Sequence, residues 1–465
     1  MLKKNIIANF LGNGYVVVLQ FALVPFLLKY LGTEAYGLVG IYITLLAALN
    51  MLDMGLSPAL SRELARLSAV PNAHSLMRIT VTTLESIYFL IALLIILVFF
   101  FASHWFAQHW LNNNTLNSET VTTCLRLIGA QCALQFLTNY YTNGLNGLQH
   151  MVRANYVLSL NHTLRAFFGL IVLIKFSASV ELYFLTQLMM TFFGLLLTAY
   201  ALYTRLPKSA PKADKNINLK DTIKLRFSME RLDACKHFAT GMALTSMLTF
   251  FIMQTDKIIL SKLVSLEEFA YYIVAVNIAV TIGGVAAIIS RSVLPRMTQL
   301  VTNNNTDALK ILYLKSSSLV AWLILPIAGL LIAFQQQFLT LYLGSLEKAN
   351  HIAPVFSLLI IGYAIHSLNY IPYALSLAYG WTKYGINVSI VAFLAMTPIT
   401  IILTLHFGVL GSAGSWALLS IGYFTLSILY LHKHCLPRTT LQWYGANKLP
   451  LLLSSSIVIF YLILK

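Results

Sequence analysis

Residues 26–45, FLLKYLGTEAYGLVGIYITL, decide the fold, because residues 258–278, IILSKLVSLEEFAYYIVAVNI, repeat them in altered form. Each copy is an apolar run interrupted by a short polar turn, the pattern of two helices joined by a hairpin. At an offset of 233 positions the identical pairs are Leu27 and Leu260, Lys29 and Lys262, and Glu34 and Glu267. The alternative to an internal duplication is chance similarity between two hairpins of apolar helices.

The composition indicates a membrane protein. Hydrophobic residues make up 58% of the chain and charged residues 10%, whereas soluble domains contain about 45–50% and about 25%. The formal net charge of +16 would suit nucleic acid in a soluble protein. On a chain this apolar we expect no nucleic-acid partner, and basic residues sorted to one side of a bilayer. The four cysteines, Cys124, Cys132, Cys235 and Cys435, form no CxxC pair and predict no disulfide, metal site or other cofactor.

Thirteen segments are apolar enough to cross about 30 Å of hydrocarbon as helices of roughly 20 residues. They lie at about residues 6–31, 35–57, 79–103, 121–145, 154–176, 180–203, 237–260, 268–292, 312–334, 352–377, 384–406, 409–432 and 448–464. The first has the basic start and apolar core of a signal peptide. It continues without a cleavage site into the second, so we interpret it as a transmembrane helix.

The basic residues predict the orientation. With the N-terminus inside, 23 of the 31 lysines and arginines fall in cytoplasmic segments and six on the outer side. Cytoplasmic loops are the ones that carry an excess of Lys and Arg. We therefore expect a multi-pass protein whose N-terminus is cytoplasmic.

The similar hairpins join spans 1 and 2 and spans 7 and 8, so the repeat unit is six helices. An even number of crossings keeps both copies the same way up, which predicts two parallel repeats related by an axis along the membrane normal. We expect an all-α polytopic protein with six-helix bundles at 1–204 and 237–434. Residues 205–236 predict a cytoplasmic linker with an amphipathic lead-in helix, and residues 435–465 a C-terminal tail with an extra helix.

Two six-helix halves are the architecture of an alternating-access carrier, whose substrate site lies between the halves near the bilayer midplane. Polar residues within the spans should outline this cavity, since a polar group facing lipid is penalised. Amides, imidazoles and phenols suit a sugar-bearing ligand. The candidates are Asn13, Gln20, Gln131, Gln135, Asn139, Asn143, His162, His366 and Tyr370. For any single amide, the alternative is a hydrogen bond between packed helices.

Two arginines lie within the predicted spans. An Arg at the centre of a span costs roughly 2.5–3.5 kcal/mol, so each needs a compensating role. Arg126 in the fourth span and Arg165 in the fifth are candidates for pairing with an anionic group of the substrate.

Three carboxylates are candidates for ion coupling, namely Glu85, Asp53 and Asp256. Each also has a structural alternative. Glu85 could form a salt bridge with a cation such as Arg78, and Asp53 could be a helix-end partner of Arg62. For Asp256 we favour a local ion pair with the adjacent Lys257.

Longer motifs resemble a known family. The resemblance rests on GNGYVVVLQFALVPFLLKYLGTEAYGLVGIY, LDMGLSPALSRELARL, QTDKIILSKLVSLEEFAYYIVAVNI and SVLPRM. These stretches are similar to the polysaccharide transporter family, the Wzx-type flippases for O-antigen and related lipid-linked oligosaccharides. This family lies within the multidrug/oligosaccharidyl-lipid/polysaccharide exporter superfamily. The resemblance covers about residues 5–435 and is most specific in P-x-L-L-x-x-L-G-x-x-x-Y-G and Q-x-D-x-x-I-L.

The resemblance implies a V-shaped, twelve-helix, alternating-access carrier with a cationic cavity in the bacterial cytoplasmic membrane. The thirteenth predicted span departs from that pattern. The implied function is that of a flippase, not an enzyme, which moves a polyprenyl-pyrophosphate-linked oligosaccharide from the inner to the outer leaflet. Its implied partners are the lipid-linked oligosaccharide and membrane lipids, with a polysaccharide polymerase as a further candidate.

Other functions stay open at this point. A multidrug or cation exporter of the same superfamily would share the fold, although Arg126 and Arg165 argue against a cavity built for cations. A lipid II flippase is less favoured, because members of that kind usually have fourteen spans. A membrane glycosyltransferase or polymerase would need a larger outer loop than the roughly 17 residues available between spans.

Overall fold

A computed structural model describes residues 2–52, 56–68, 73–112, 116–176, 179–207, 247–248 and 250–464. These residues form helices joined by short turns, and none of them lies in an extended strand. The predicted all-α fold is therefore confirmed.

The helices of the first part of the chain are α1 (Leu2–Leu31), α2 (Thr33–Leu52), α3 (Leu56–Ser68), α4 (His74–His109), α5 (Ser118–Gly147), α6 (Met151–Ile171), the π-helix η1 (Val172–Phe176) and α7 (Val180–Tyr203). Residues 250–263 are also helical. The later helices are α10 (Leu266–Thr302), α11 (Thr306–Ala333), α12 (Gln335–Leu343), α13 (Leu346–Ser367), α14 (Tyr370–Ala378), α15 (Thr382–Gly422), η2 (Tyr423–Ser427), α16 (Ile428–Cys435) and α17 (Thr440–Leu464).

Eight helical stretches in the described part of the chain are long and apolar enough to cross a membrane. The longest, Lys383–Cys435, contains two of the predicted spans. Its helix α15 is broken at Gly408 (φ 55°, ψ −132°), and the hydroxyls of Thr404 and Ser412 lie 2.7 Å apart across the break. Four predicted spans remain: α2 is shorter, 121–145 in α5 and 448–464 in α17 are not among the eight stretches, and 237–260 lies largely outside the described residues.

The chain divides into two compact units, Met1–Phe250 and Phe251–Lys465. Both similar stretches are hairpins, as predicted. The first turns at Gly32, whose φ of 84° suits glycine, and the second turns at residues 264–265 ahead of α10. The predicted linker lies outside the described residues from residue 208 onward, and the limits of the two repeats stay predictions.

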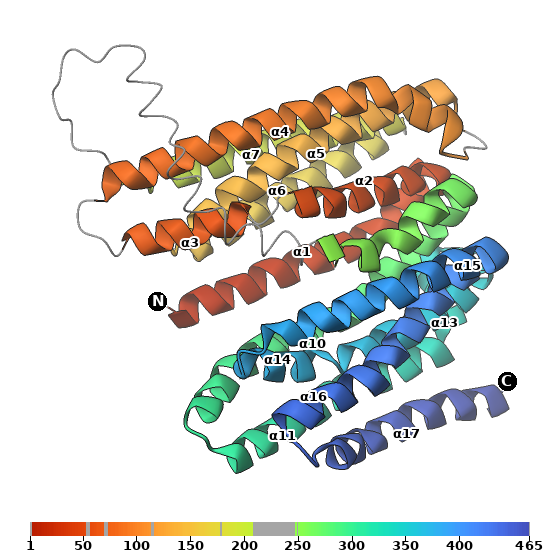
Figure 1. Ribbon diagram of the computed structural model, residues 1–465. Helices are drawn as coiled ribbons and strands as arrows, with labels where there is room; N and C mark the ends of the chain where they lie inside the picture. The colour runs from red at the N-terminus through yellow and green to blue at the C-terminus, as the bar shows by residue number, and fades with distance from the viewer. Residues whose placement is uncertain are drawn as a thin grey trace. The chain divides into compact units, whose positions relative to one another are not determined.

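Helix α5 is the centre of the first unit. It packs against α4 and α7 over much of its length and also contacts α3 and α2, while α1 packs on α6 (Figure 1). The ring of Tyr88 stacks on Phe136 at 4.7 Å and lies 4.5 Å from the ring of Tyr140. The Tyr88 hydroxyl is satisfied by Ser57 at 2.7 Å, as a buried phenol requires. This core fixes the rotation of α5 and thereby the direction of its amide side chains.

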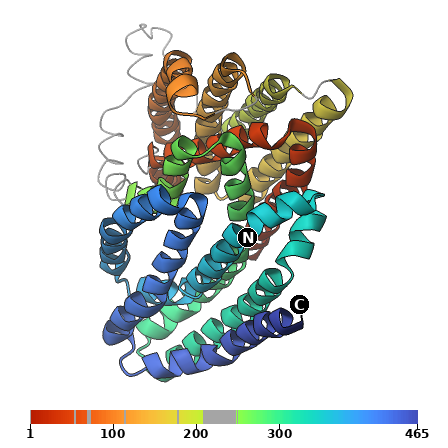
Figure 2. The same cartoon turned by 90° about the vertical axis from the view of Figure 1, so that its right-hand side faces the viewer.

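In the second unit, α13 packs against α10, α12 and α15, and α17 lies along α11 (Figure 2). The predicted extra helix is thus a packed element of this unit. Trp443 near its start is fully buried. The joint beside it is polar: Nε2 of His432 is 2.7 Å from the Tyr313 hydroxyl, and Nδ1 is 3.1 Å from the hydroxyl of Thr440.

Candidate functional site

Arg165 lies near the middle of the span Met151–Phe176 and reaches two neighbouring helices. Its Nε donates to Oε1 of Gln187 in α7 at 2.9 Å, and its Nη2 donates to the hydroxyl of Tyr42 in α2 at 3.2 Å. The guanidinium also lies 5.7 Å from the centroid of the Tyr42 ring. Helices α2 and α7 therefore hold this cation in a defined direction.

The partners of Arg165 are neutral. Among the described residues, no carboxylate lies within ion-pair distance of its guanidinium, and the side chain is half-buried. Hydrogen bonds to an amide and a phenol satisfy donors but leave the positive charge uncompensated. Since the interaction of two charges strengthens as the local dielectric falls, this site offers a strong partner to an anion that enters it.

Gly169 makes the contact between α6 and α7 possible. A Cβ at this position would lie 2.7 Å from Nε2 of Gln187, so only glycine leaves room for that amide. Gly194 plays the same part for Asn161, whose Nδ2 donates to the carbonyl of Met190 at 2.8 Å. Small residues allow membrane helices to approach closely enough for such polar contacts.

The sequence predicted Arg165 but missed Tyr42 and Gln187. A signal for Gln187 was present, because it is the single amide in the otherwise apolar segment 180–203. Tyr42 gave no comparable signal, since an aromatic residue in an apolar helix is usually part of the core.

The predicted amide stripe of α5 divides into two parts. Gln131 is 1% exposed, and neither its Nε2 nor its Oε1 has a hydrogen-bond partner in the described part of the chain. Further along, Gln135 donates to Oδ1 of Asn139 at 3.1 Å, and Nδ2 of Asn143 donates to the Asn139 carbonyl at 3.0 Å. The alternative of local hydrogen bonding applies to that second part, whereas Gln131 is buried with its amide beside the Tyr42 hydroxyl.

The other predicted residues of the first unit lie at different places. His162 is half-buried, one turn before Arg165 and within electrostatic range of it. Gln20 is exposed on α1. The side chain of Asn13 and the whole of Asp53 lie outside the described residues.

Arg126 has contacts of a different kind. It is exposed on α5, donates from Nε to the Ser103 hydroxyl at 3.2 Å, and lies 4.9 Å from the centroid of the Phe100 ring. Both partners belong to α4, whereas those of Arg165 belong to α2 and α7. The two arginines therefore contact different helices and share no partner, although the sequence grouped them as one anion site.

Glu85 accepts hydrogen bonds from two phenols. The hydroxyl of Tyr141 in α5 donates at 2.5 Å to one carboxylate oxygen, and that of Tyr203 in α7 donates at 2.6 Å to the other. No ion pair joins Glu85 to Arg78 among the described residues, and Nε of Arg78 donates to the carbonyl of Pro207 at 2.8 Å. Glu85 thus joins α4, α5 and α7 within the first unit.

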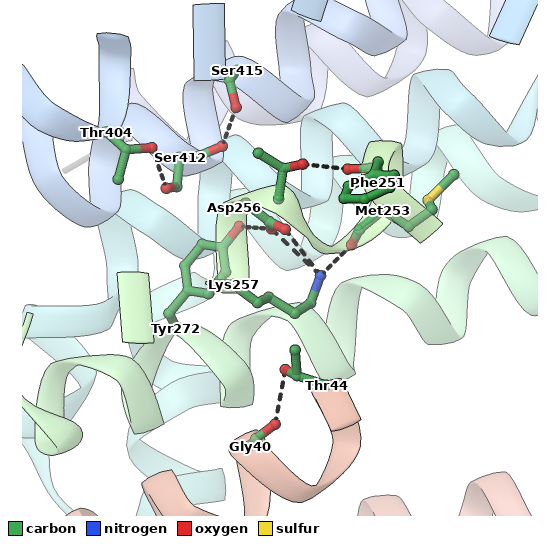
Figure 3. Close-up of polar contacts among 11 residues, drawn as sticks. Gly40, Thr44, Phe251, Met253, Asp256, Lys257, Tyr272, Thr404, Ser412 and Ser415 are labelled. Carbon is green, nitrogen blue, oxygen red and sulfur yellow. Dashed lines mark hydrogen bonds and ion pairs between the residues drawn. The ribbon is translucent and has the colours of Figure 1, made fainter. Parts of the chain in front are cut away.

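In the second unit, the expected ion pair between Asp256 and Lys257 is confirmed, with Nζ 3.3 Å from Oδ1 (Figure 3). The Tyr272 hydroxyl donates to Oδ2 of Asp256 at 2.5 Å, and Nζ of Lys257 donates to the carbonyl of Met253 at 2.7 Å. A small pocket beside the carboxylate has polar lining from Thr255, Asp256, Thr397, Thr400 and Ser415. The pair leaves little net charge at this position.

His366 lies in an aromatic cluster of the second unit. Its ring centroid is 5.4 Å from Trp416, 5.3 Å from Tyr423 and 6.1 Å from Tyr370. Neither Nδ1 of His366 nor Nε1 of Trp416 has a partner in the described part of the chain. Rings with free polar atoms suit a ligand that has apolar faces and hydroxyl groups.

The family model described as polysaccharide biosynthesis protein matches residues 2–301, well over half of the 465 residues, and the MatE family model matches residues 242–402. No curated protein matches the chain.

Solved structures match over nearly the whole length. An inward-facing multidrug resistance MATE family transporter of the MOP superfamily has a TM-score of 0.71 at 16% identity, covering 90% of this chain and 95% of its own. The lipid II flippase MurJ, in an inward closed conformation, has a TM-score of 0.66 at 15% identity, covering 98% of both chains. A MOP superfamily transporter from Pyrococcus furiosus has a TM-score of 0.58 at 14% identity, covering 98% of this chain and 96% of its own. At these identities the likeness establishes the fold.

Proposed function

This chain belongs to the polysaccharide biosynthesis protein family, and from that premise we propose that it is a flippase for a polyprenyl-pyrophosphate-linked oligosaccharide. It is a multi-pass membrane transporter of the MOP superfamily, and the proteins it matches are transporters and flippases, not enzymes. The substrate would be a repeat unit of a surface polysaccharide such as O-antigen. It would pass from the inner to the outer leaflet of the bacterial cytoplasmic membrane by alternating access.

The observation that carries this proposal is the uncompensated charge of Arg165. A guanidinium in the middle of a span, held by the neutral groups of Gln187 and Tyr42, is costly unless an anion pairs with it. Guanidinium groups bind phosphate with paired donors. The pyrophosphate of a lipid carrier supplies such an anion, and Gln131 beside Tyr42 supplies a neutral group for a sugar hydroxyl or a phosphate oxygen.

The driving force for export follows from the negative charge of the substrate head group. With the cytoplasm negative, outward movement of each negative charge is favoured by about 2.3 kcal/mol per 100 mV. In this proposal, Arg165 compensates the head-group charge inside the membrane, and neutral polar and aromatic side chains, including Gln131 and His366, replace part of the hydration of the sugars. Glu85 and Asp256 stay candidates for ion coupling.

A multidrug exporter is the second candidate, because the MatE model matches residues 242–402. Such a protein needs anionic side chains to receive cationic drugs. Asp256 is paired with Lys257, and Arg165 has the wrong sign for that cargo. These charges favour the lipid-linked glycan.

The test is complementation of a flippase-null strain, scored as surface glycan by immunoblot at matched membrane expression. Wild type should restore the glycan. Arg165→Gln should lower export about tenfold or more, since a hydrogen-bonded charge pair contributes roughly 1.5–3 kcal/mol, and Arg165→Lys should retain part of it. Arg126→Gln, tested beside it, shows whether the second predicted arginine also contributes. Drug resistance without glycan export would replace this proposal by the exporter.

A further inference from the structure

An apolar groove runs along the first unit between α2 and α4. Its lining residues are Leu45, Ala48, Leu49, Leu56, Ile91, Leu94, Ile95, Val98, Phe99 and Cys132. Its cavity volume is about 400 Å³, which lies within the roughly 300–1,000 Å³ typical of sites for drug-sized ligands. The groove therefore has room for a substantial apolar group.

The packing of three helices creates this groove. Helices α2 and α4 each pack on α5, so α5 forms the floor and the other two form the walls. The deep part of the groove is closed to solvent, because Leu49 and Ile95 on the walls are each 7% exposed and Cys132 on the floor is fully buried. The rim is open, since Leu94 is 59% and Val98 50% exposed.

A glycine closes the far end. At Gly129 of α5, an added Cβ would lie 2.3 Å from Cβ of Phe99. Because Gly129 has no side chain, Phe99 packs directly against α5, and helices α4 and α5 meet at this point. Gly129 thus defines where the groove ends.

The Arg165 site lies at this same end of the groove, because Tyr42, which accepts a hydrogen bond from Arg165, is one turn before Leu45 on α2, and Cys132 is one turn after Gly129 on α5. Tyr42, Leu45 and Leu49 recur at i, i+3 and i+7 and share one face of α2. Cys132 on the floor lies within electrostatic range of both Tyr42 and Arg165. An apolar channel and an uncompensated cation are therefore neighbours, which matches an amphiphile with an anionic head and one long chain.

We propose that this groove holds the polyprenyl chain of the lipid-linked glycan while Arg165 holds its pyrophosphate; this assignment rests on the function proposed above. The position along the membrane favours that occupant over a bulk phospholipid. Arg165 lies near the middle of its span, whereas the phosphate of a bilayer lipid stays at the interface. Only a lipid whose head group is being carried across brings its phosphate to this depth with the chain still attached.

The test uses two adjacent leucines of α4. The photoreactive residue p-benzoylphenylalanine is placed at Leu94, which lines the groove, or at Leu93, which is 53% exposed and does not line it. The full-length chain is held in phosphatidylcholine nanodiscs with radiolabelled undecaprenyl phosphate. Cross-linking at Leu94 should exceed that at Leu93 roughly fivefold or more, given the apolar area that a chain buries in the groove.

Two further arms identify the ligand. Arg165→Gln should reduce cross-linking at Leu94, whereas excess phosphatidylglycerol should not compete. Ala48→Trp, which fills the groove, should reduce both cross-linking and glycan export, while Leu93→Trp should leave export unchanged. Equal labelling at Leu93 and Leu94, or competition by phosphatidylglycerol, would overturn the assignment. If export still depends on Arg165 in that case, the proposed function stands and only the groove assignment fails.

Discussion

Arg165 and Gln187 bond each other twice: Nε of the arginine donates to Oε1 at 2.9 Å, and Nε2 of the glutamine donates to the Arg165 carbonyl at 3.0 Å. The second bond fixes which end of the amide faces the guanidinium. Gln187→Glu would keep the shape and place a negative charge on the cation. We expect it to lower glycan export about tenfold or more, because a buried ion pair neutralises the charge that the substrate needs.

Gln187→Met tests the orientation of Arg165 separately from its charge. It removes both hydrogen bonds but leaves Arg165 charged, so export should fall less than in Gln187→Glu. The measurement is surface glycan in the complemented strain, with protein amount in the membrane as control. Normal export by Gln187→Glu would mean that the charge of Arg165 is not used.

Gly169→Ala should impair transport with little loss of stability. The new Cβ would meet Nε2 of Gln187 at 2.7 Å, and that amide is the flexible end of a side chain, so it can move away. Moving it releases Arg165 from its fixed direction. Gly284→Ala is the matched control, because a Cβ there has no heavy atom within 4 Å. The melting temperatures of the two purified variants should equal that of wild type, whereas glycan export should fall only in Gly169→Ala.

Features that depend on residue type alone could be predicted from the sequence. The two hairpins, the apolar spans and the cost of Arg165 inside one of them follow from composition and spacing. Its partners do not follow, because Tyr42 is 123 residues away and its contact depends on how α2 and α6 pack. Arg126 makes the same point, since its contacts with α4 depend on the rotation of α5.

Tyr141 and Tyr203 donate to the two oxygens of the same carboxylate, yet their burial differs, at 3% and 36% exposed. A hydrogen bond to a charged group contributes about 1.5–3 kcal/mol when buried, and solvent weakens an exposed one. Tyr141→Phe should therefore lower the melting temperature of the detergent-solubilised protein more than Tyr203→Phe. A larger decrease in melting temperature for Tyr203→Phe would show that the hydrogen bond from Tyr203 stabilises Glu85 more than the one from Tyr141.

His432 joins three helices of the second unit, through Tyr313 in α11 and Thr440 in α17. His432→Leu would leave the fully buried Tyr313 hydroxyl without its partner, at a cost of about 1–3 kcal/mol. We expect a lower melting temperature, with Tyr313→Phe restoring part of it in the double variant, because phenylalanine removes the buried hydroxyl that His432→Leu leaves without a partner. Additive losses in the double variant would contradict this coupling.

Helix α17 runs parallel to α11, and this direction predicts the side of its C-terminal end. Ser318 donates to the Ala446 carbonyl at 3.2 Å, a Cβ at Gly329 would meet Ser454, and Gln337 donates to the Tyr461 hydroxyl at 2.7 Å. Residue numbers rise together along α17 and along α11 with the following α12, which contains Gln337, and α11 is long and apolar enough to cross the membrane. The end of α17 should thus lie on the same side as the end of α11, opposite the turn at residues 303–305.

With the orientation predicted from the basic residues, that side is the periplasm. Alkaline phosphatase fused after residue 465 should be active and green fluorescent protein at the same point dark, whereas green fluorescent protein inserted in the turn at 303–305 should fluoresce. Because each reporter works on only one side of the membrane, the two positions serve as controls for each other. If both positions report the same side, α17 does not cross beside α11, and the parallel contacts that place it there must be wrong.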